Sequence, residues 1–183
     1  MQTQVSMGKL INNQPEHPLL NETVYLSHKK WNKTRPHVLV VACSDGRLQG
    51  NVDDFLHNHL GIDSYDRLYM PGGPGALAHS GAEFLRADQW RREGKFLIDA
   101  HVLEEVILLF HAAAFDGPVE SNCADYTRKL PTQAPSELRA QQELDTIDVL
   151  ARVFASHPQL RIRVYRAEVL VNGDVQFVQL QIE

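Results

Sequence analysis

Two continuous apolar runs, at residues 38–42 (VLVVA) and 106–110 (VILLF), most constrain what this chain can fold into. Neither run has a polar face, which is typical of strands that are covered on both faces of a parallel sheet. The first run leads directly into Cys43 and the second into His111. Parallel strands deliver their carboxyl ends to one edge of an open α/β sheet, where ligands bind. The sequence therefore predicts a site at this edge that contains both side chains.

Shorter patterns extend this prediction to an α/β fold, with a mainly parallel β-sheet flanked by helices. A short strand is expected at 67–70, and helices are expected at 21–33, 53–60, 80–92, 96–103 and 136–156. The sequence Asn172-Gly173-Asp174 separates two alternating apolar segments, 161–171 and 175–182, which is a strong signal for a C-terminal β-hairpin. Residues 112–135 show no regular pattern.

The helix expected at 136–156 is amphipathic, with Ser136 as its N-cap. Its apolar face comprises Leu138, Leu144, Ile147, Leu150 and Phe154.

Length and composition narrow the classes of protein. The 183 residues match one domain of ordinary size, and we expect a polar N-terminal arm at 1–20 and a single domain at 21–183. The net charge of −5 is spread along the chain, whereas nucleic-acid binding needs clustered Lys and Arg. No apolar run approaches the roughly 20 residues that span a membrane. The polar N-terminus lacks the apolar stretch of a signal peptide. Two cysteines make no disulfide framework, so we expect a cytoplasmic protein.

Cys43, Asp45 and Arg47 alternate directly after the first apolar run, in the sequence Cys-Ser-Asp-Gly-Arg. With His111 after a second strand, this motif resembles the beta-class carbonic anhydrases. In that family the first strand ends in Cys-Ser-Asp-Ser-Arg and a later strand in His-x-x-Cys. The glycine-rich stretch at 70–73 also resembles a loop of the family, without its Arg and Asn. The resemblance covers about residues 32–118 and, more loosely, the helix near 137–150.

The resemblance implies a zinc enzyme that interconverts carbon dioxide and bicarbonate. Cys43 and His111 would bind zinc, for which thiolate and imidazole are good ligands, with water in the fourth position. Zinc lowers the pKa of that water towards ~7, and the resulting hydroxide attacks carbon dioxide. Asp45 would accept a hydrogen bond from the hydroxide, and Arg47 would hold Asp45 in place. The family also implies a homodimer or higher homo-oligomer, with the N-terminal arm wrapped around the partner.

The chain departs from the family at the third ligand, because Ala114 stands where His-x-x-Cys requires cysteine. Three other side chains are candidates for this position. Cys123 would restore a Cys-His-Cys set by folding back from 112–135, and it is the predicted ligand. Asp45 would bind at the cost of its role as acceptor, and Asp116 is the third candidate.

Two other functions remain open from the sequence. A metal-free homologue would bind a small anion or a protein partner through the same cleft, with Asp45 and Arg47 as an ion pair that fixes the loop. Alternatively, Cys43 would act as a nucleophile activated by His111. The glycines within 71–75 favour a tight turn over an anion-binding nest.

Overall fold

The computed structural model describes residues 25–80, 84–130 and 134–181. The chain divides into two compact units, 1–34 and 35–183. In the first unit, the described residues 25–34 form neither helix nor strand, so the helix expected at 21–33 is wrong for this part. The expected arm at 1–20 and the boundary at residue 21 lie outside the described residues.

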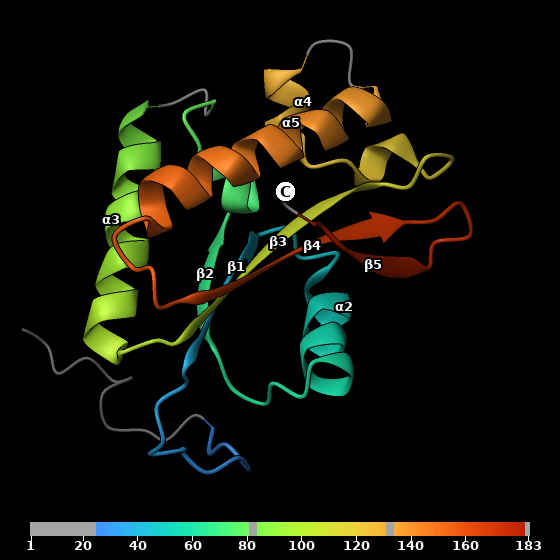
Figure 1. Ribbon diagram of the computed structural model, residues 1–183. Coiled ribbons are helices and arrows are strands. Elements are labelled where there is room, and N and C mark those ends of the chain that lie inside the picture. Colours follow the sequence, from blue (N-terminus) through green and yellow to red (C-terminus); the bar gives the residue numbers. More distant parts are fainter. Residues whose placement is uncertain (1–24, 81–83, 131–133, 182–183) are drawn as a thin grey trace, which may run out of the picture. The chain divides into compact units, whose positions relative to one another are not determined.

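The second unit is built on a five-stranded sheet with the order β2-β1-β3-β4-β5 (Figure 1). Its strands are β1 (Val38–Cys43), β2 (Asp66–Met70), β3 (Glu105–Ala113), β4 (Arg161–Val169) and β5 (Val175–Gln179). All neighbouring strands are parallel except β4 and β5, which form the expected antiparallel hairpin. The predicted α/β class with a mainly parallel sheet is confirmed.

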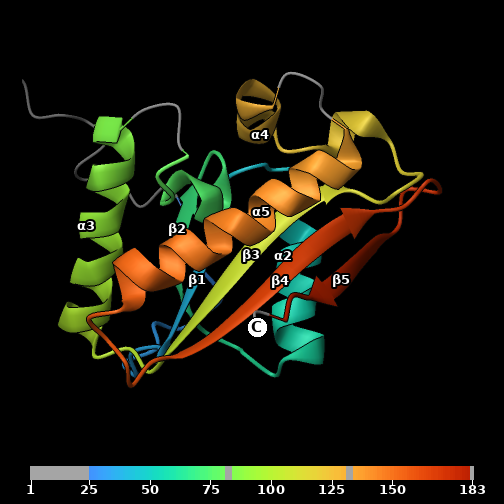
Figure 2. The same cartoon turned by 45° about the horizontal axis from the view of Figure 1, so that its top comes forward.

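Helices cover both faces of the sheet, which explains why β1 and β3 have no polar side (Figure 2). One face packs against α2 (Gln49–Asp54) and the π-helical turn Phe55–His59 that continues it. The other face carries α3 (Phe84–His101), α4 (Ala124–Lys129) and α5 (Pro135–Val149), with a π-helical turn at Leu150–Phe154. All nine residues of β3 are buried, and this strand forms the centre of both core layers. None of the helices within the described ranges is long and apolar enough to cross a membrane.

The orientation of α5 differs from the expected one. Leu144 and Ile147 were expected to be buried, yet they are 61% and 53% exposed. The buried side instead comprises Leu138, Gln142, Asp145, Thr146 and Val149. Three of these are polar, and each forms hydrogen bonds within the protein, so the buried face does not show in the hydrophobic pattern.

The beginning of α5 also corrects the expectation for Ser136. The helix starts at Pro135, which occupies the first helical position, and Ala134 is the N-cap. Proline is favoured there because its missing N–H has no partner within the helix anyway.

The stretch 112–135, expected to be irregular, contains regular structure. Ala112 and Ala113 extend β3, a 3-10 turn follows at Val119–Ser121, and α4 comes next. The two helices expected at 80–92 and 96–103 form the single helix α3.

Gly73 lies in the tight turn after β2, and its φ of +55° is unfavourable for other residues. A Cβ atom here would lie 2.9 Å from the backbone nitrogen of Cys43 and 3.1 Å from the carbonyl carbon of Ala42. Because backbone cannot move aside cheaply, we expect Gly73→Ala to lower the free energy of unfolding by about 1–3 kcal/mol, measured by urea denaturation. Gly46→Ala, which meets open space, is the control, and equal effects of both variants would contradict the prediction.

Candidate metal centre

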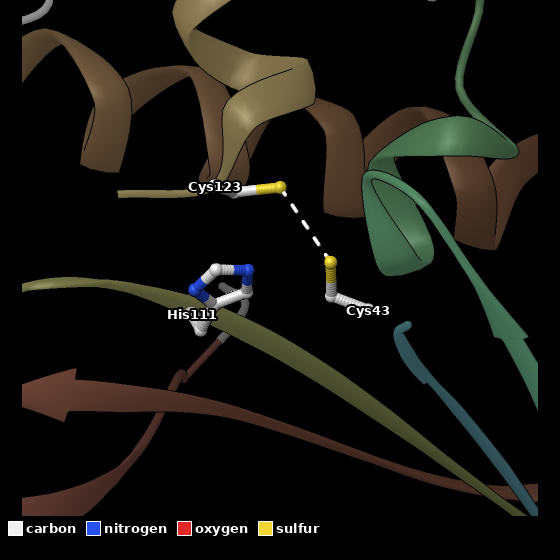
Figure 3. Close-up of side chains that lie close together, drawn as sticks. All are labelled: Cys43, His111 and Cys123. Atoms are coloured by element: carbon white, nitrogen blue, oxygen red, sulfur yellow. Dashed lines mark hydrogen bonds between the residues drawn. The ribbon is translucent and has the colours of Figure 1, made fainter. Parts of the chain in front are cut away.

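Three side chains that are distant in the sequence meet at the carboxyl edge of the sheet. Cys43 ends β1, His111 lies near the end of β3, and Cys123 immediately precedes α4. Their ligand atoms all lie within 4.8 Å of one another, and the two sulfur atoms are 3.9 Å apart. Figure 3 shows a ring nitrogen of His111 facing the two sulfur atoms. The structure thus brings together the three residues that the sequence suggested as zinc ligands.

Strand register explains why Cys43 and His111 are neighbours. Ala42 of β1 pairs with Leu109 of β3 in parallel. Cys43 and His111 come one and two residues later, so both side chains reach the same edge at nearly the same level. This juxtaposition is the one expected from the two apolar runs.

A hydrogen bond orients the ring of His111, which is only 2% exposed. Its Nδ1 lies 3.1 Å from the carbonyl oxygen of Ser121. A carbonyl only accepts, so Nδ1 carries a hydrogen, and in the neutral ring Nε2 is the nitrogen with the lone pair. Within the described part of the chain this buried Nε2 has no partner. Histidines that bind metals are oriented in the same way, by donating their other N–H to a carbonyl or carboxylate.

The two thiols differ in acidity. A hydrogen bond from the Cys123 thiol, together with His111 and the backbone N–H of Gly72, holds the pKa of Cys43 below its usual value against the effect of burial. The neighbouring Cys43 and burial raise the pKa of Cys123. Cys43 is therefore the first of the pair to become a thiolate, and a dication between the sulfur atoms would favour the loss of the second proton.

The donor set fits zinc. Two thiolates and a neutral imidazole are common zinc ligands, and three protein ligands leave the fourth tetrahedral position open. A metal at this point would also give the buried Nε2 of His111 the partner that it lacks among the described residues.

Asp45 and Arg47 form a forked ion pair beside the three ligands. Arg47 Nε donates to Asp45 Oδ1 at 3.0 Å and Arg47 Nη2 to Oδ2 at 2.6 Å, while the backbone N–H of Arg47 also reaches Oδ1 at 3.0 Å. These bonds from Arg47 lower the pKa of Asp45 to about 2, so its carboxylate is ionised throughout the physiological range.

The other two candidates for the third ligand lie outside the cluster. Asp45 is engaged by Arg47, and Asp116 is exposed to solvent. Among the described residues, the group with metal-ligand spacing consists of Cys43, His111 and Cys123.

A cavity of about 240 Å³ adjoins the ion pair. Its lining includes Asp45, Arg47, Leu48, Pro118, Val169 and Val175. Ser121, whose carbonyl accepts the hydrogen bond from His111, also lines this cavity, whereas the three candidate ligands are not among its lining residues. Its walls present more apolar than polar surface, and the polar residues among them are Asp45, Arg47, Asn51, Glu120 and Ser121.

Sequence reasoning missed the two residues that precede Cys123. The Ser121 carbonyl orients His111, and Asn122, only 4% exposed, accepts a hydrogen bond from the backbone of Ala113 at 2.9 Å. A backbone carbonyl leaves no trace in a sequence. The asparagine at position 122, next to the candidate ligand Cys123, was the one sequence feature that could have indicated how this segment is held.

No protein-family model and no curated protein sequence matches the chain. Among solved structures, it is similar to the beta-carbonic anhydrase CafA of Aspergillus fumigatus, with 13% identity over 81% of this chain and 77% of that chain and a TM-score of 0.47. The beta-carbonic anhydrase CcaA has 12% identity over 80% of this chain and 78% of that chain, with a TM-score of 0.44. For the beta-carbonic anhydrase isoform I of Trichomonas vaginalis, the identity is 16%, the coverage 95% and 98%, and the TM-score 0.37. With TM-scores below 0.5, these likenesses leave the function to be inferred from the site itself.

Proposed function

We propose that this protein is a zinc enzyme that catalyses the reversible hydration of carbon dioxide to bicarbonate, with zinc held by Cys43, His111 and Cys123. The observation that carries the proposal is the convergence of two sulfur atoms and one ring nitrogen within 4.8 Å, where the nitrogen is buried and has no other partner among the described residues. A site with three protein ligands and one open position is typical of catalytic rather than structural zinc.

Asp45 is the hydrogen-bond acceptor for the attacking water in this proposal. When bound, zinc is a Lewis acid that makes water nucleophilic near neutral pH. Three N–H groups of Arg47 donate to the Asp45 carboxylate, and the N–H of Nε reaches both of its oxygen atoms, Oδ1 at 3.0 Å and Oδ2 at 3.2 Å. Asp45, whose side chain is 18% exposed, would accept the hydrogen of the attacking water beside these bonds and so direct the lone pair of that water towards the substrate. Because its pKa is about 2, Asp45 stays an acceptor at neutral pH.

Arg47 has N–H donors beyond those that bind Asp45. Its side chain has five N–H donors: Nε and one N–H of Nη2 bind Asp45, and one N–H of Nη1 donates to the Glu120 carbonyl at 3.0 Å. The guanidinium lines the cavity together with apolar side chains and with the acidic residues Asp45 and Glu120. Carbon dioxide is apolar and bicarbonate is an anion, and this combination of wall and charge suits both.

The cavity also favours a second candidate function, the binding of a small anion by a metal-free protein through Arg47. The two functions differ in their need for metal. Bicarbonate binding that persists after chelation and disappears in Arg47→Ala would support the second candidate over the first.

Metal analysis and activity on the same samples test the proposal. Untagged protein purified without a chelator is expected to contain about one zinc per chain by plasma mass spectrometry, and to hydrate carbon dioxide in a stopped-flow assay. Chelation is expected to abolish both, and added zinc to restore both. Protein that binds no zinc even when zinc is offered would overturn the proposal.

The activity of the zinc-loaded protein is expected to rise with pH, with an apparent pKa near ~7, the value typical of water on catalytic zinc. Asp45 does not contribute to this rise, because a group with a pKa of about 2 is already ionised at pH 5. Zinc content measured at each pH is the control, since ligand protonation also releases metal at low pH. Activity that is independent of pH from 6 to 9, at constant zinc content, would contradict this prediction.

A further inference from the structure

The segment that ends in Cys123 is fastened to the site residue by residue. Each of the three residues before Cys123 accepts one hydrogen bond from the site or from the strand that carries His111. The bonds run from Arg47 Nη1 to the Glu120 carbonyl (3.0 Å), from His111 Nδ1 to the Ser121 carbonyl (3.1 Å), and from the Ala113 N–H to Asn122 Oδ1 (2.9 Å).

Asn122 differs from its two neighbours because it acts through its side chain, which a substitution can remove. The described pairing of β1 with β3 ends at Ala42 and Leu109, whereas β3 continues alongside β4 to Ala113. The N–H of Ala113 therefore lies beyond the last β1 partner, and Asn122 Oδ1 supplies an acceptor in its place. The two groups are buried, so this bond is shielded from water.

The position of Cys123 depends on such hydrogen bonds. It follows His111 by twelve positions, whereas a His-x-x-Cys arrangement would fix a third ligand within one short turn of chain. A longer loop has more conformational freedom to lose before its thiol reaches the metal. The hydrogen bonds to the three residues before Cys123 therefore restrict where its sulfur lies.

We propose that Asn122 is a positioning residue that places the Cys123 thiolate on the metal. This inference rests on the proposed function, because it presupposes a metal between Cys43, His111 and Cys123. Asn122 Oδ1 holds the end of the loop against β3, and the next residue along the chain then delivers its sulfur to within 3.9 Å of Cys43 Sγ. The amide nitrogen of Asn122 has no hydrogen-bond partner within the described part of the chain, so the oxygen is the functional half of this side chain.

Zinc affinity and the spectrum of the cobalt-substituted protein test the role of Asn122. Asn122→Ala is expected to weaken zinc binding by about 10–100-fold in a chelator competition, the range seen when residues that orient metal ligands are lost. The sulfur-to-cobalt charge-transfer absorption is expected to fall below the wild-type value, because the Cys123 thiolate then reaches the metal in only part of the molecules. A purely structural role of Asn122 would lower stability and leave this spectrum unchanged.

Three further variants complete the experiment. Asn122→Asp keeps an acceptor oxygen and is expected to keep the two-thiolate spectrum. Asn122→Ser, whose oxygen lies one bond closer to the backbone, is a second truncation in case the alanine variant does not fold, and is expected to lose thiolate absorption likewise. Ser121→Ala is the matched control: it removes a buried hydroxyl that donates to the Pro118 carbonyl, and it leaves the carbonyl that binds His111.

The outcomes separate the two proposals. Wild-type protein that takes up neither zinc nor cobalt refutes the proposed function. Wild-type protein that binds metal, together with Asn122→Ala and Asn122→Ser variants that keep its affinity and full thiolate absorption, refutes the role of Asn122 alone. An equal loss in Ser121→Ala also refutes it, because the effect would then belong to the turn and not to the amide.

Discussion

Replacing Cys123 by serine is expected to remove zinc and carbon dioxide hydration together. The serine hydroxyl is a poor zinc ligand at neutral pH, which leaves Cys43 and His111 as the two remaining protein ligands. Loss of a residue that merely orients a ligand costs 10–100-fold in metal affinity, so loss of the ligand itself should cost more than about 100-fold. Zinc content after dialysis, affinity by chelator competition and hydration rate are the measurements.

Two further variants show whether this effect is specific. Cys43→Ser is expected to lose zinc in the same way, because its sulfur is the other thiolate of the cluster. His101→Ala, which removes a partly buried histidine paired with Asp66 away from the cluster, is expected to retain full zinc occupancy. If Cys123→Ser retained zinc while Cys43→Ser lost it, the third ligand would have to be another residue.

The sheet could be predicted because the sequences of its two central strands fit almost no other structure. Residues 38–42 and 106–110 are apolar on both faces, and β1 and β3 are covered on both faces by helices. The hairpin was equally accessible, since Gly173 in its turn has a φ of +87° that glycine adopts readily. Local chemistry determined these elements, and short-range patterns therefore revealed them.

The buried face of α5 could not be predicted, because tertiary contacts determine it. Asp145 accepts hydrogen bonds from the Tyr126 hydroxyl at 2.6 Å and from Ser80 at 2.6 Å, and Gln142 donates to the His111 carbonyl at 3.0 Å. Polar groups that are satisfied in this way are buried as readily as apolar ones. A sequence does not show partners that lie tens of residues away.

The third ligand could be predicted from the sequence only in part. The motif ending in Arg47 and the position of His111 indicated where a metal would lie, and Ala114 showed that the familiar ligand was absent. Cys123 could be proposed because it is the other cysteine in the chain. Its position depends on the turn at Val119–Ser121 and on Asn122, for which residues 112–135 have no periodic signal. The type of side chain thus identified the candidate, whereas its position at the site became known only from the structure.

Replacing Asp45 by asparagine is expected to reduce kcat/KM for carbon dioxide hydration by about 10²–10³-fold, the range for loss of one positioned hydrogen-bonding group in an active site. The amide is nearly isosteric, but it places an N–H donor where the carboxylate accepts and carries no charge. Zinc content is expected to stay at about one per chain, because Asp45 is not part of the ligand cluster. Stopped-flow rates and metal analysis on the same samples measure both quantities.

The size of this effect separates a catalytic role of Asp45 from a structural one. The Arg47 side chain is 62% exposed, and ion pairs in such positions contribute only about 0–1 kcal/mol to stability. A structural loss of that size leaves nearly all molecules folded and cannot reduce the rate a hundredfold. Asp88→Asn, which breaks a surface ion pair with Arg92, is the matched control and should leave the rate unchanged. An Asp45→Asn variant with full zinc and the wild-type rate would leave Asp45 as an anchor for Arg47 alone, and another group would then have to orient the attacking water.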